Sequence, residues 1–280
     1  MAEITASAVA KLREMTNAGL MDCKKALAET NGDLDAAVDV LRKKGQASAD
    51  KKAGRSAKEG VIANYIAPGA KVGVLLEVNC ETDFVARNES FRAVCDEMAK
   101  KLGSNGGTDL EPDRVAVVSK MGENILVGRH ERIEVSGNGL VAAYIHTGAK
   151  VGVLVEVGAN NEATTQKEEF KQLVRDITLQ IAAAHPISVT RDEVPKALVD
   201  KEDEINKQSD RLKGKPAQAM EKILQGMREK YFQTNCLVDQ GFVKNPDMTV
   251  GQHIGSVSKG LGDDIKVRRF VRFQVGEAAA

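Results

Sequence analysis

Two stretches of the chain have nearly the same sequence. Residues 60–78 read GVIANYIAPGAKVGVLLEV, residues 139–157 read GLVAAYIHTGAKVGVLVEV, and thirteen of the 19 positions are identical at a constant offset of 79. Each copy alternates apolar and polar residues, passes a glycine-containing turn and continues into a run rich in Val and Leu, which is the pattern of a β-hairpin. At the same offset, Phe91 and Phe170 each open a helical stretch. The sequence therefore predicts a core of two related α+β units.

The segment between the second strand and the helix differs between the two copies. The first copy has Thr82–Val85 there, and at the offset of 79 Asp83 and Phe84 correspond to Glu162 and Ala163. If Phe84 completed the core of its own unit, the second copy should also hold a large apolar residue, but it holds alanine. Two interpretations stay open: Phe84 packs beneath its own loop, or Asp83 and Phe84 form a loop tip that a partner binds.

The first 45 residues have the pattern of a small helical domain. Helical spacing of the apolar residues predicts three helices, over residues 5–16, 22–30 and 33–44. Asp22 and Asp33 can cap the second and third helices, because a carboxylate accepts hydrogen bonds from the free N–H groups of a first helical turn. We therefore expect a three-helix head of marginal size.

A polar segment rich in small residues follows the head. From Arg42 to Lys58 it carries seven basic residues and one acidic residue, Asp50. This composition is typical of a solvated tether, and the alternative is an arm that contacts phosphate groups. We expect a basic tether over residues 46–58 and keep the arm as the alternative.

After the second core unit the apolar spacing becomes that of longer helices. Leu198, Ile205 and Leu212 recur every seven residues, residues 213–216 break the helix, and helical spacing then resumes as far as Tyr231. Two amphipathic helices joined by a Gly/Pro turn predict an antiparallel, coiled-coil-like hairpin. Such a hairpin is too thin to bury both of its faces, which indicates docking on another surface, such as a second copy of the protein.

The last patterned segment, IKVRRFVRFQV, alternates apolar and charged residues and predicts a half-buried strand that returns to a core sheet. We therefore expect an α+β, multi-domain protein with a duplicated core and an inserted helical hairpin. The expected divisions are the head 1–45, the tether 46–58, the first core unit 59–137, the second core unit 138–189, the hairpin 190–233 and a C-terminal segment 234–280 that returns a strand to the core.

The composition argues against several classes of protein. Forty Lys and Arg balance 40 Asp and Glu, so the chain has no cationic surplus for a nucleic-acid surface along its whole length. No apolar run approaches the roughly 18 residues that a membrane-spanning helix needs. The first residues, MAEITASAVAKL, lack the basic and apolar pattern of a secretory signal. We expect a cytoplasmic protein.

The sequence lacks the motifs of catalysis and of metal binding. Its four cysteines stand far apart, as expected of reduced thiols, and its four histidines occur in no metal-binding motif such as H-E-x-x-H. The phosphate-binding motif G-x-x-x-x-G-K-[ST] is also missing. We therefore expect no enzyme activity, no metal site and no cofactor.

A set of short segments spans nearly the whole chain in a fixed order: NAGLMDCKKAL and NGDLDAAVDVLRKKG in the head, then EVNCETDFVARNESF, GENI, QIAAAHP, TVGQ and RFQVGE. In both sequence and order these segments resemble the bacterial elongation factor Ts family. The T-D-F-V segment between a strand and a helix is the specific signal. The head by itself resembles ubiquitin-associated three-helix domains.

The resemblance implies a guanine-nucleotide exchange factor of protein synthesis, which binds elongation factor Tu in its GDP-bound and nucleotide-free forms. By resemblance, the head docks on the nucleotide-binding domain of that partner. Thr82, Asp83, Phe84 and Val85 then bind near the nucleotide, dislodge Mg²⁺ and promote GDP release so that GTP can bind. The resemblance also implies that the hairpin can mediate a homodimer, and neither a membrane nor a nucleic acid is expected as a direct partner. The alternative function is an RNA- or ribosome-binding module that uses the basic segment 42–58.

Overall fold

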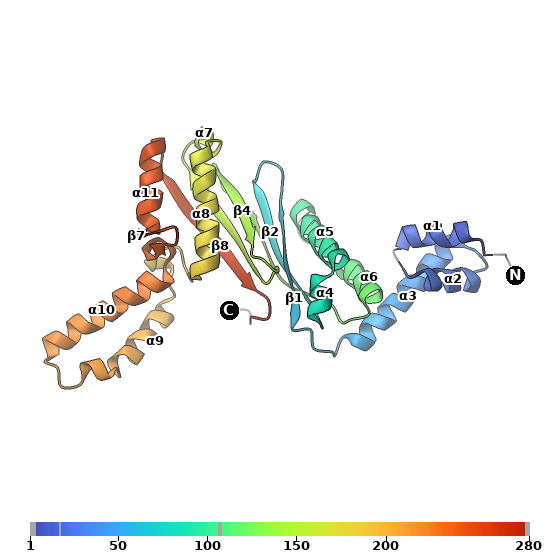
Figure 1. Cartoon of the computed structure of the whole chain (residues 1–280), viewed down its shortest axis with the longest axis horizontal. Coiled ribbons are helices and arrows are strands. Elements are labelled where there is room, and N and C mark those ends of the chain that lie inside the picture. Colours follow the sequence, from blue (N-terminus) through green and yellow to red (C-terminus); the bar gives the residue numbers. More distant parts are fainter. Residues whose placement is uncertain (1–3, 17, 106–107, 278–280) are drawn as a thin grey trace.

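Two three-stranded antiparallel sheets form the centre of the computed structural model, which describes residues 4–16, 18–105 and 108–277 (Figure 1). The strand order is β1-β2-β3 in the first sheet and β4-β5-β8 in the second. The strands are β1 (Glu59–Ile66), β2 (Val72–Cys80), β3 (Leu126–Glu134), β4 (Gly139–Ile145), β5 (Val151–Ala159) and β8 (Ile265–Gln274). The predicted α+β class is therefore confirmed. The predicted return of the last segment to a core sheet is also confirmed, because β8 pairs with β5.

Helices cover the outer face of each sheet, and the two sheets face each other (Figure 1). Phe91 on α5 and Phe170 on α8 are both fully buried, each in the core between its helix and its own sheet. The helices of this layer are α4 (Asp83–Arg87), α5 (Glu89–Asn105) and α6 (Glu111–Met121) in the first unit, and α7 (Glu162–Thr165), α8 (Glu168–Ala184) and α11 (Val250–Leu261) in the second.

A shared core lies between the two sheets. Ile62 and Leu75 from the first sheet pack there with Val141 and Leu154 from the second. The strands are thus buried on both faces, which explains why β2 and β5 are nearly continuous apolar runs rather than alternating ones. The sheets approach so closely at Gly73 that a Cβ atom there would lie 2.5 Å from Val141 Cγ1.

Main-chain hydrogen bonds join the two units in matching pairs. Ile62 N donates to Ala149 O at 2.7 Å, and Val141 N donates to Ala70 O at 2.8 Å. These four residues are related by the same offset of 79, so each unit gives the other the same bond that it receives. The duplication seen in the sequence therefore appears in the structure as two units that face each other with approximate two-fold symmetry.

The third strands of the two sheets also match, at an offset of 140 rather than 79. Residues of β3 and β8 that share this offset include Arg129 with Arg269, and the glycines that end the preceding helices, Gly122 and Gly262, share it as well. Both glycines adopt left-handed backbone, with φ of 75° and 65°. The offset grows because the second unit carries an insertion between α8 and α11.

The N-terminal helices are α1 (Ala6–Thr16), α2 (Leu20–Glu29) and α3 (Leu34–Lys52). Asp33 caps α3 as predicted, since its carboxylate accepts a hydrogen bond from Ala36 N at 3.0 Å. The prediction for Asp22 is wrong: Gly19 occupies the N-cap of α2, and Asp22 lies in the first turn and pairs with Lys44.

The prediction that the third helix ends at residue 44 is also wrong, because α3 continues to Lys52. Gly45 and Ala49 are buried, and Ala49 belongs to the core of the first unit. Small residues in this segment therefore let the helix pack closely on the core, and most of the expected tether is helical. The division of the chain into domains stays a prediction.

The insertion of the second unit consists mainly of two helices, α9 (Lys196–Lys207) and α10 (Ala217–Asn235), which lie side by side at the opposite end of the molecule from α1 and α2 (Figure 1). Leu212 is not part of the first helix but lies in the short 3-10 turn Asp210–Leu212 between the two. Two further 3-10 turns, Arg191–Glu193 and Leu237–Asp239, and the strands β6 (Gly241–Phe242) and β7 (Asn245–Thr249) complete the insertion. No helix within the described ranges is both long and apolar enough to cross a membrane. The ubiquitin-associated and coiled-coil descriptions stay predictions.

Candidate functional site

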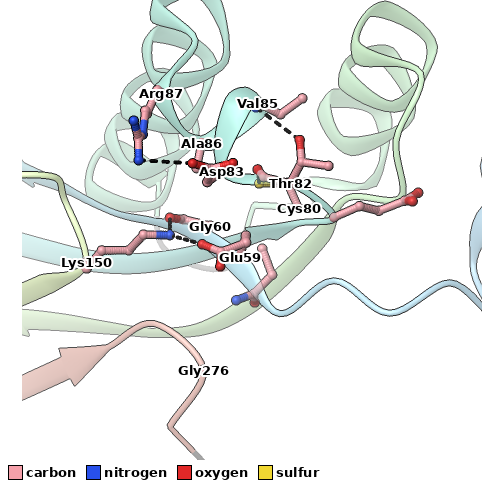
Figure 2. A network of polar contacts seen from close by, with 12 residues as sticks. Glu59, Gly60, Cys80, Thr82, Asp83, Val85, Ala86, Arg87, Lys150 and Gly276 are labelled. Carbon is pink, nitrogen blue, oxygen red and sulfur yellow. Dashed lines mark hydrogen bonds and ion pairs between the residues drawn. The ribbon is translucent and has the colours of Figure 1, made fainter.

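The predicted site residues Thr82–Val85 lie where β2 ends and α4 begins, and we call them the 82–85 loop. Thr82 is the N-cap of α4: its backbone is extended, and its Oγ1 accepts a hydrogen bond from Val85 N at 3.3 Å (Figure 2). An N-cap threonine satisfies a free N–H group of the first helical turn and fixes where the helix begins. The loop is thus held at the start of a helix by its own first residue.

Phe84 projects into solvent from this helix start. Its side chain is 82% exposed, and among the described residues the next most exposed large hydrophobic side chain, Met21, reaches 60%. The neighbours of Phe84 are anchored, because Val85 packs against the core of the first unit and Ala86 is buried. The interpretation that Phe84 packs beneath its own loop is therefore wrong.

The side chain of Asp83, the residue before Phe84, also remains accessible. Its Oδ2 is 3.0 Å from Nη2 of Arg87, one helical turn further on, and the two side chains are 45% and 77% exposed (Figure 2). Exposed pairs of this kind contribute about 0–1 kcal/mol, so a stronger donor on a partner can replace Arg87. The loop therefore presents an accessible carboxylate and an exposed aromatic ring at consecutive positions.

Glu123, from the turn before β3, holds the loop from below. Its Oε2 accepts hydrogen bonds from Glu81 N at 3.0 Å and Thr82 N at 3.1 Å, and its Oε1 accepts one from Thr82 Oγ1 at 2.6 Å. Hydrogen bonds to an ionised carboxylate are roughly twice as strong as neutral ones. Reasoning from sequence did not assign Glu123 to the site, although it belongs to the GENI segment that contributed to the family resemblance.

Three further contacts fix the same loop. Asn124 N donates to Glu81 Oε1 at 2.6 Å, and Arg55 forms a longer pair with the same carboxylate oxygen at 3.5 Å. Cys80 Sγ donates to Thr82 O at 3.2 Å. Burial, helped by the negative charge of Glu123, raises the pKa of the Cys80 thiol to about 11, so at neutral pH it stays protonated and able to donate. The loop backbone is therefore rigidly positioned while Phe84 stays in solvent.

The second unit has a matching carboxylate beneath its corresponding loop, but no aromatic residue at the position of Phe84. Asp263, which matches Glu123 at the offset of 140, accepts hydrogen bonds from Asn160 N at 3.1 Å and Asn161 N at 3.0 Å. These two amides match those of Glu81 and Thr82 at the offset of 79. Ala163 then stands at the position of Phe84. The framework is common to both units, and only the first unit carries an exposed aromatic residue on it.

The polar groups of the loop are those of a surface that binds another molecule. Within residues 4–16, 18–105 and 108–277, no three His, Cys, Asp or Glu side chains gather in a way that could hold a metal ion. The four cysteines are buried and form no disulfide. Chemically, this surface offers shape, one carboxylate and one ring, which are the features of a binding site.

Comparison with known proteins identifies the family. A profile described as "Elongation factor TS" matches residues 81–277, a range that includes the 82–85 loop, Glu123 and β8. Among the relatives, elongation factor Ts of Nitratidesulfovibrio vulgaris is 41% identical over 280 residues, covering 99% of this chain and 97% of its own length. Those of Clostridium kluyveri and Symbiobacterium thermophilum are 42% and 45% identical, covering 98% and 99% of this chain and 93% of their own lengths. The chain therefore belongs to the elongation factor Ts family, the nucleotide exchange factors of translation elongation.

Proposed function

We propose that the chain binds elongation factor Tu in its GDP-bound and nucleotide-free forms and accelerates the release of GDP in the cytoplasm. In this proposal the 82–85 loop binds near the nucleotide, dislodges Mg²⁺ and thereby lets GDP leave and GTP bind. The chain itself makes and breaks no covalent bond. Membership of the family supports the exchange activity, and the geometry of the loop supports the assignment of its residues.

The observation that carries the proposal is the exposure of Phe84 on a rigid support. Burial of a phenylalanine side chain is worth about 1.5–3 kcal/mol, and the free protein forgoes this stabilisation at Phe84. A partner that receives the ring recovers it. Since the backbone of the loop is already fixed by Glu123 and Cys80, binding loses little conformational entropy there.

Exchange needs no reactive group, only a difference in affinity. A factor that binds its partner more tightly without nucleotide than with it must, by thermodynamic reciprocity, weaken the binding of nucleotide. A thousandfold easier release corresponds to about 4 kcal/mol, which is more than one buried phenylalanine supplies. We therefore propose a broad interface in which other parts of this elongated molecule hold the loop in place (Figure 1).

The test is the rate at which labelled GDP leaves elongation factor Tu, measured by stopped flow with and without this chain. The wild-type chain should accelerate release. Phe84→Ala should reduce the acceleration about tenfold, because most of the free energy of burying the ring is lost. Asp83→Ala combined with Phe84→Ala should reduce it further. Glu162→Ala is the matched control, since it removes the carboxylate that corresponds to Asp83 from the unit without a ring. A folded double variant with unaltered GDP release would remove the loop from the mechanism.

The RNA-binding alternative has less support. Part of the basic segment 42–58 is helix α3, Lys44 pairs with Asp22, and Arg55 pairs with Glu81. These contacts reduce the number of cations available to phosphate groups. Affinity for RNA that falls steeply with salt concentration would favour the alternative.

A homodimer through α9 and α10 also stays a proposal. Leu198 and Ile205 on α9 are 43% and 55% exposed, although both are large and apolar. A second copy that covered them would bury this surface. Analytical ultracentrifugation over a range of concentrations distinguishes a monomer from this dimer.

A further inference from the structure

In each unit, a lysine at an equivalent position donates a hydrogen bond to the backbone of the other unit. Lys71 Nζ donates to Gly139 O, and Lys150 Nζ donates to Gly60 O, both at 3.0 Å. The lysines and the glycines are each related by the offset of 79. Each ammonium group therefore lies at the same place relative to the other unit, close to the residues that follow the second strand.

The two lysines pair with carboxylates at positions that do not correspond between the units. Lys71 Nζ also pairs with Glu162 Oε1 at 2.9 Å, and Glu162 is the first residue of α7. The residue that corresponds to Glu162 is Asp83. By symmetry, Lys150 would pair with Asp83.

Lys150 instead pairs with Glu59, at 2.5 Å from its Oε2 (Figure 2). The residue that corresponds to Glu59 in the second unit is Asn138, which has no charge and donates its amide hydrogen to Asn160 O at 2.6 Å. Asp83 is also one methylene shorter than Glu162. Both differences keep the lysine away from Asp83, whose carboxylate pairs with Arg87, one helical turn further on.

We propose that Glu59 is a positioning residue, which holds the Lys150 ammonium group in an ion pair. The Asp83 carboxylate therefore stays available to a hydrogen-bond donor of the protein partner. This inference rests on the proposed function of the 82–85 loop. A lysine ammonium is a flexible point charge with three donors, so it turns to the nearest carboxylate when its partner is removed. In the chain without the Glu59 charge, the symmetry with Lys71 and Glu162 makes Asp83 that carboxylate, and the partner must then displace Lys150 before it can bind Asp83.

The experiment compares GDP release from elongation factor Tu in the presence of six versions of the full chain: wild type, four variants at Glu59, Lys150 and Asp83, and one control variant. Glu59→Gln should slow the stimulated release about two- to fivefold, the factor expected from one partly exposed ion pair. Glu59→Gln combined with Lys150→Met should restore the wild-type rate, because no lysine then competes for Asp83. In an Asp83→Ala background, Glu59→Gln should have no further effect. A crystal structure of the Glu59→Gln chain should show Lys150 Nζ within hydrogen-bonding distance of Asp83.

Glu162→Gln is the matched control, because it breaks the corresponding pair with Lys71 in the unit that has no ring. It should leave GDP release unchanged. If the wild-type chain itself fails to accelerate release, the proposed function is wrong. If the wild-type chain accelerates release but Glu59→Gln does so equally well, the role of Glu59 is wrong. The proposed role of Glu59 is also wrong if Glu59→Gln slows GDP release and the added Lys150→Met substitution does not restore the rate. Glu59 would then act on GDP release without involving Lys150.

Discussion

The Glu123 carboxylate lies beneath the 82–85 loop and accepts three hydrogen bonds from Glu81 and Thr82. Two of these donors are main-chain amides, so the contact fixes the path of the backbone rather than the rotamer of a single side chain. Phe84 has no comparable contact and is 82% exposed. The position from which the ring projects therefore depends on a residue that is distant in sequence and that we expect to make no contact with the partner.

Glu123→Gln tests this dependence. Glutamine offers one acceptor oxygen and an NH₂ donor, so donors of the loop lose their acceptor, at a cost of about 1–3 kcal/mol. We expect the amides of Glu81 and Thr82 to exchange with solvent deuterium faster, and stimulated GDP release to slow. Both quantities are measured on the same folded variant, by hydrogen exchange with mass spectrometry and by stopped flow.

Asp263→Asn is the matched control, because it makes the same change beneath the second loop. It should speed amide exchange at Asn160 and Asn161 without slowing GDP release. Unchanged exchange at Glu81 and Thr82 in the Glu123→Gln variant would show that the carboxylate does not hold the loop.

At the scale of elements, the segment after residue 44 shows how composition can mislead. Ala, Ser, Gly and Lys are frequent in flexible tethers, but small residues also let a helix pack closely on a neighbour. Gly45 in α3 packs closely on α6 in this way. A Cβ atom at Gly45 would lie 3.0 Å from Val115 Cγ1 and 3.1 Å from Ser119 Oγ on α6. Because α6 is distant in sequence, nothing in residues 42–58 alone could indicate the contact.

Gly45→Leu should separate α3 from α6. Leucine favours a helix more than glycine by about 1 kcal/mol, so any loss of stability must come from the contact with α6. We expect a net destabilisation of about 1–3 kcal/mol by overpacking, and faster proteolysis between α3 and β1. Urea unfolding and limited proteolysis measure the two effects.

Gly226→Leu on α10 is the control for this substitution. Nothing lies within 4 Å of a Cβ atom at Gly226, and the residue is exposed. The free energy of unfolding of this variant should rise by up to about 1 kcal/mol, because leucine favours a helix more than glycine. Equal effects of the two substitutions would show that α3 does not depend on α6.

The hairpins were predictable because their turns and their repeat are local in sequence. The turns end with Ala70 and Ala149, which have positive φ as the glycine-containing pattern suggests. Strand β3 was not predicted, because its charged residues obscure the alternation. Arg129 in β3 pairs with buried Glu77 on the neighbouring strand, and this pairing is visible only in three dimensions. Likewise, the exposure of Phe84 could be inferred from the duplication, whereas Glu123 could be connected to the loop only through the fold.

At the scale of the whole molecule, two buried glutamates connect the units. Glu77 and Glu156 correspond at the offset of 79, and each lies at a register shift of its central strand. Glu77 accepts a hydrogen bond from Arg129, which also donates to Gln274 O at 2.9 Å. In the same way, Glu156 accepts one from Arg269, which also donates to Glu134 O at 2.9 Å. Each arginine thus reaches the end of the third strand in the other unit. The two sheets are joined by charged groups at their edges and by apolar packing between them.

Glu156 should make the stability of this core dependent on pH. Burial acts to raise the pKa of its carboxyl group, but hydrogen bonds from Arg268, Arg269 and Ser136 N outweigh burial and hold the pKa below its ordinary value of 4.5. A carboxylate with a lower pKa in the folded than in the unfolded state stabilises the fold above the unfolded pKa, and that stabilisation is lost as pH falls through the folded pKa. We expect Glu156→Gln to be about 1–3 kcal/mol less stable than wild type at pH 7, because it leaves two arginines without their carboxylate.

The difference between the two chains should shrink as the pH falls below about 4.5, since the Glu156 carboxylate is then protonated first in the unfolded chain and, at lower pH, in the folded chain. Urea unfolding of both chains at pH 7 and at several lower pH values measures this difference, and subtraction removes the contribution of other carboxylates. Glu131→Gln, at an exposed position on the neighbouring unit's β3, should match wild type throughout. A difference between wild type and Glu156→Gln that stays constant down to pH 3 would mean that the contribution of Arg268 and Arg269 to stability does not depend on the charge of Glu156.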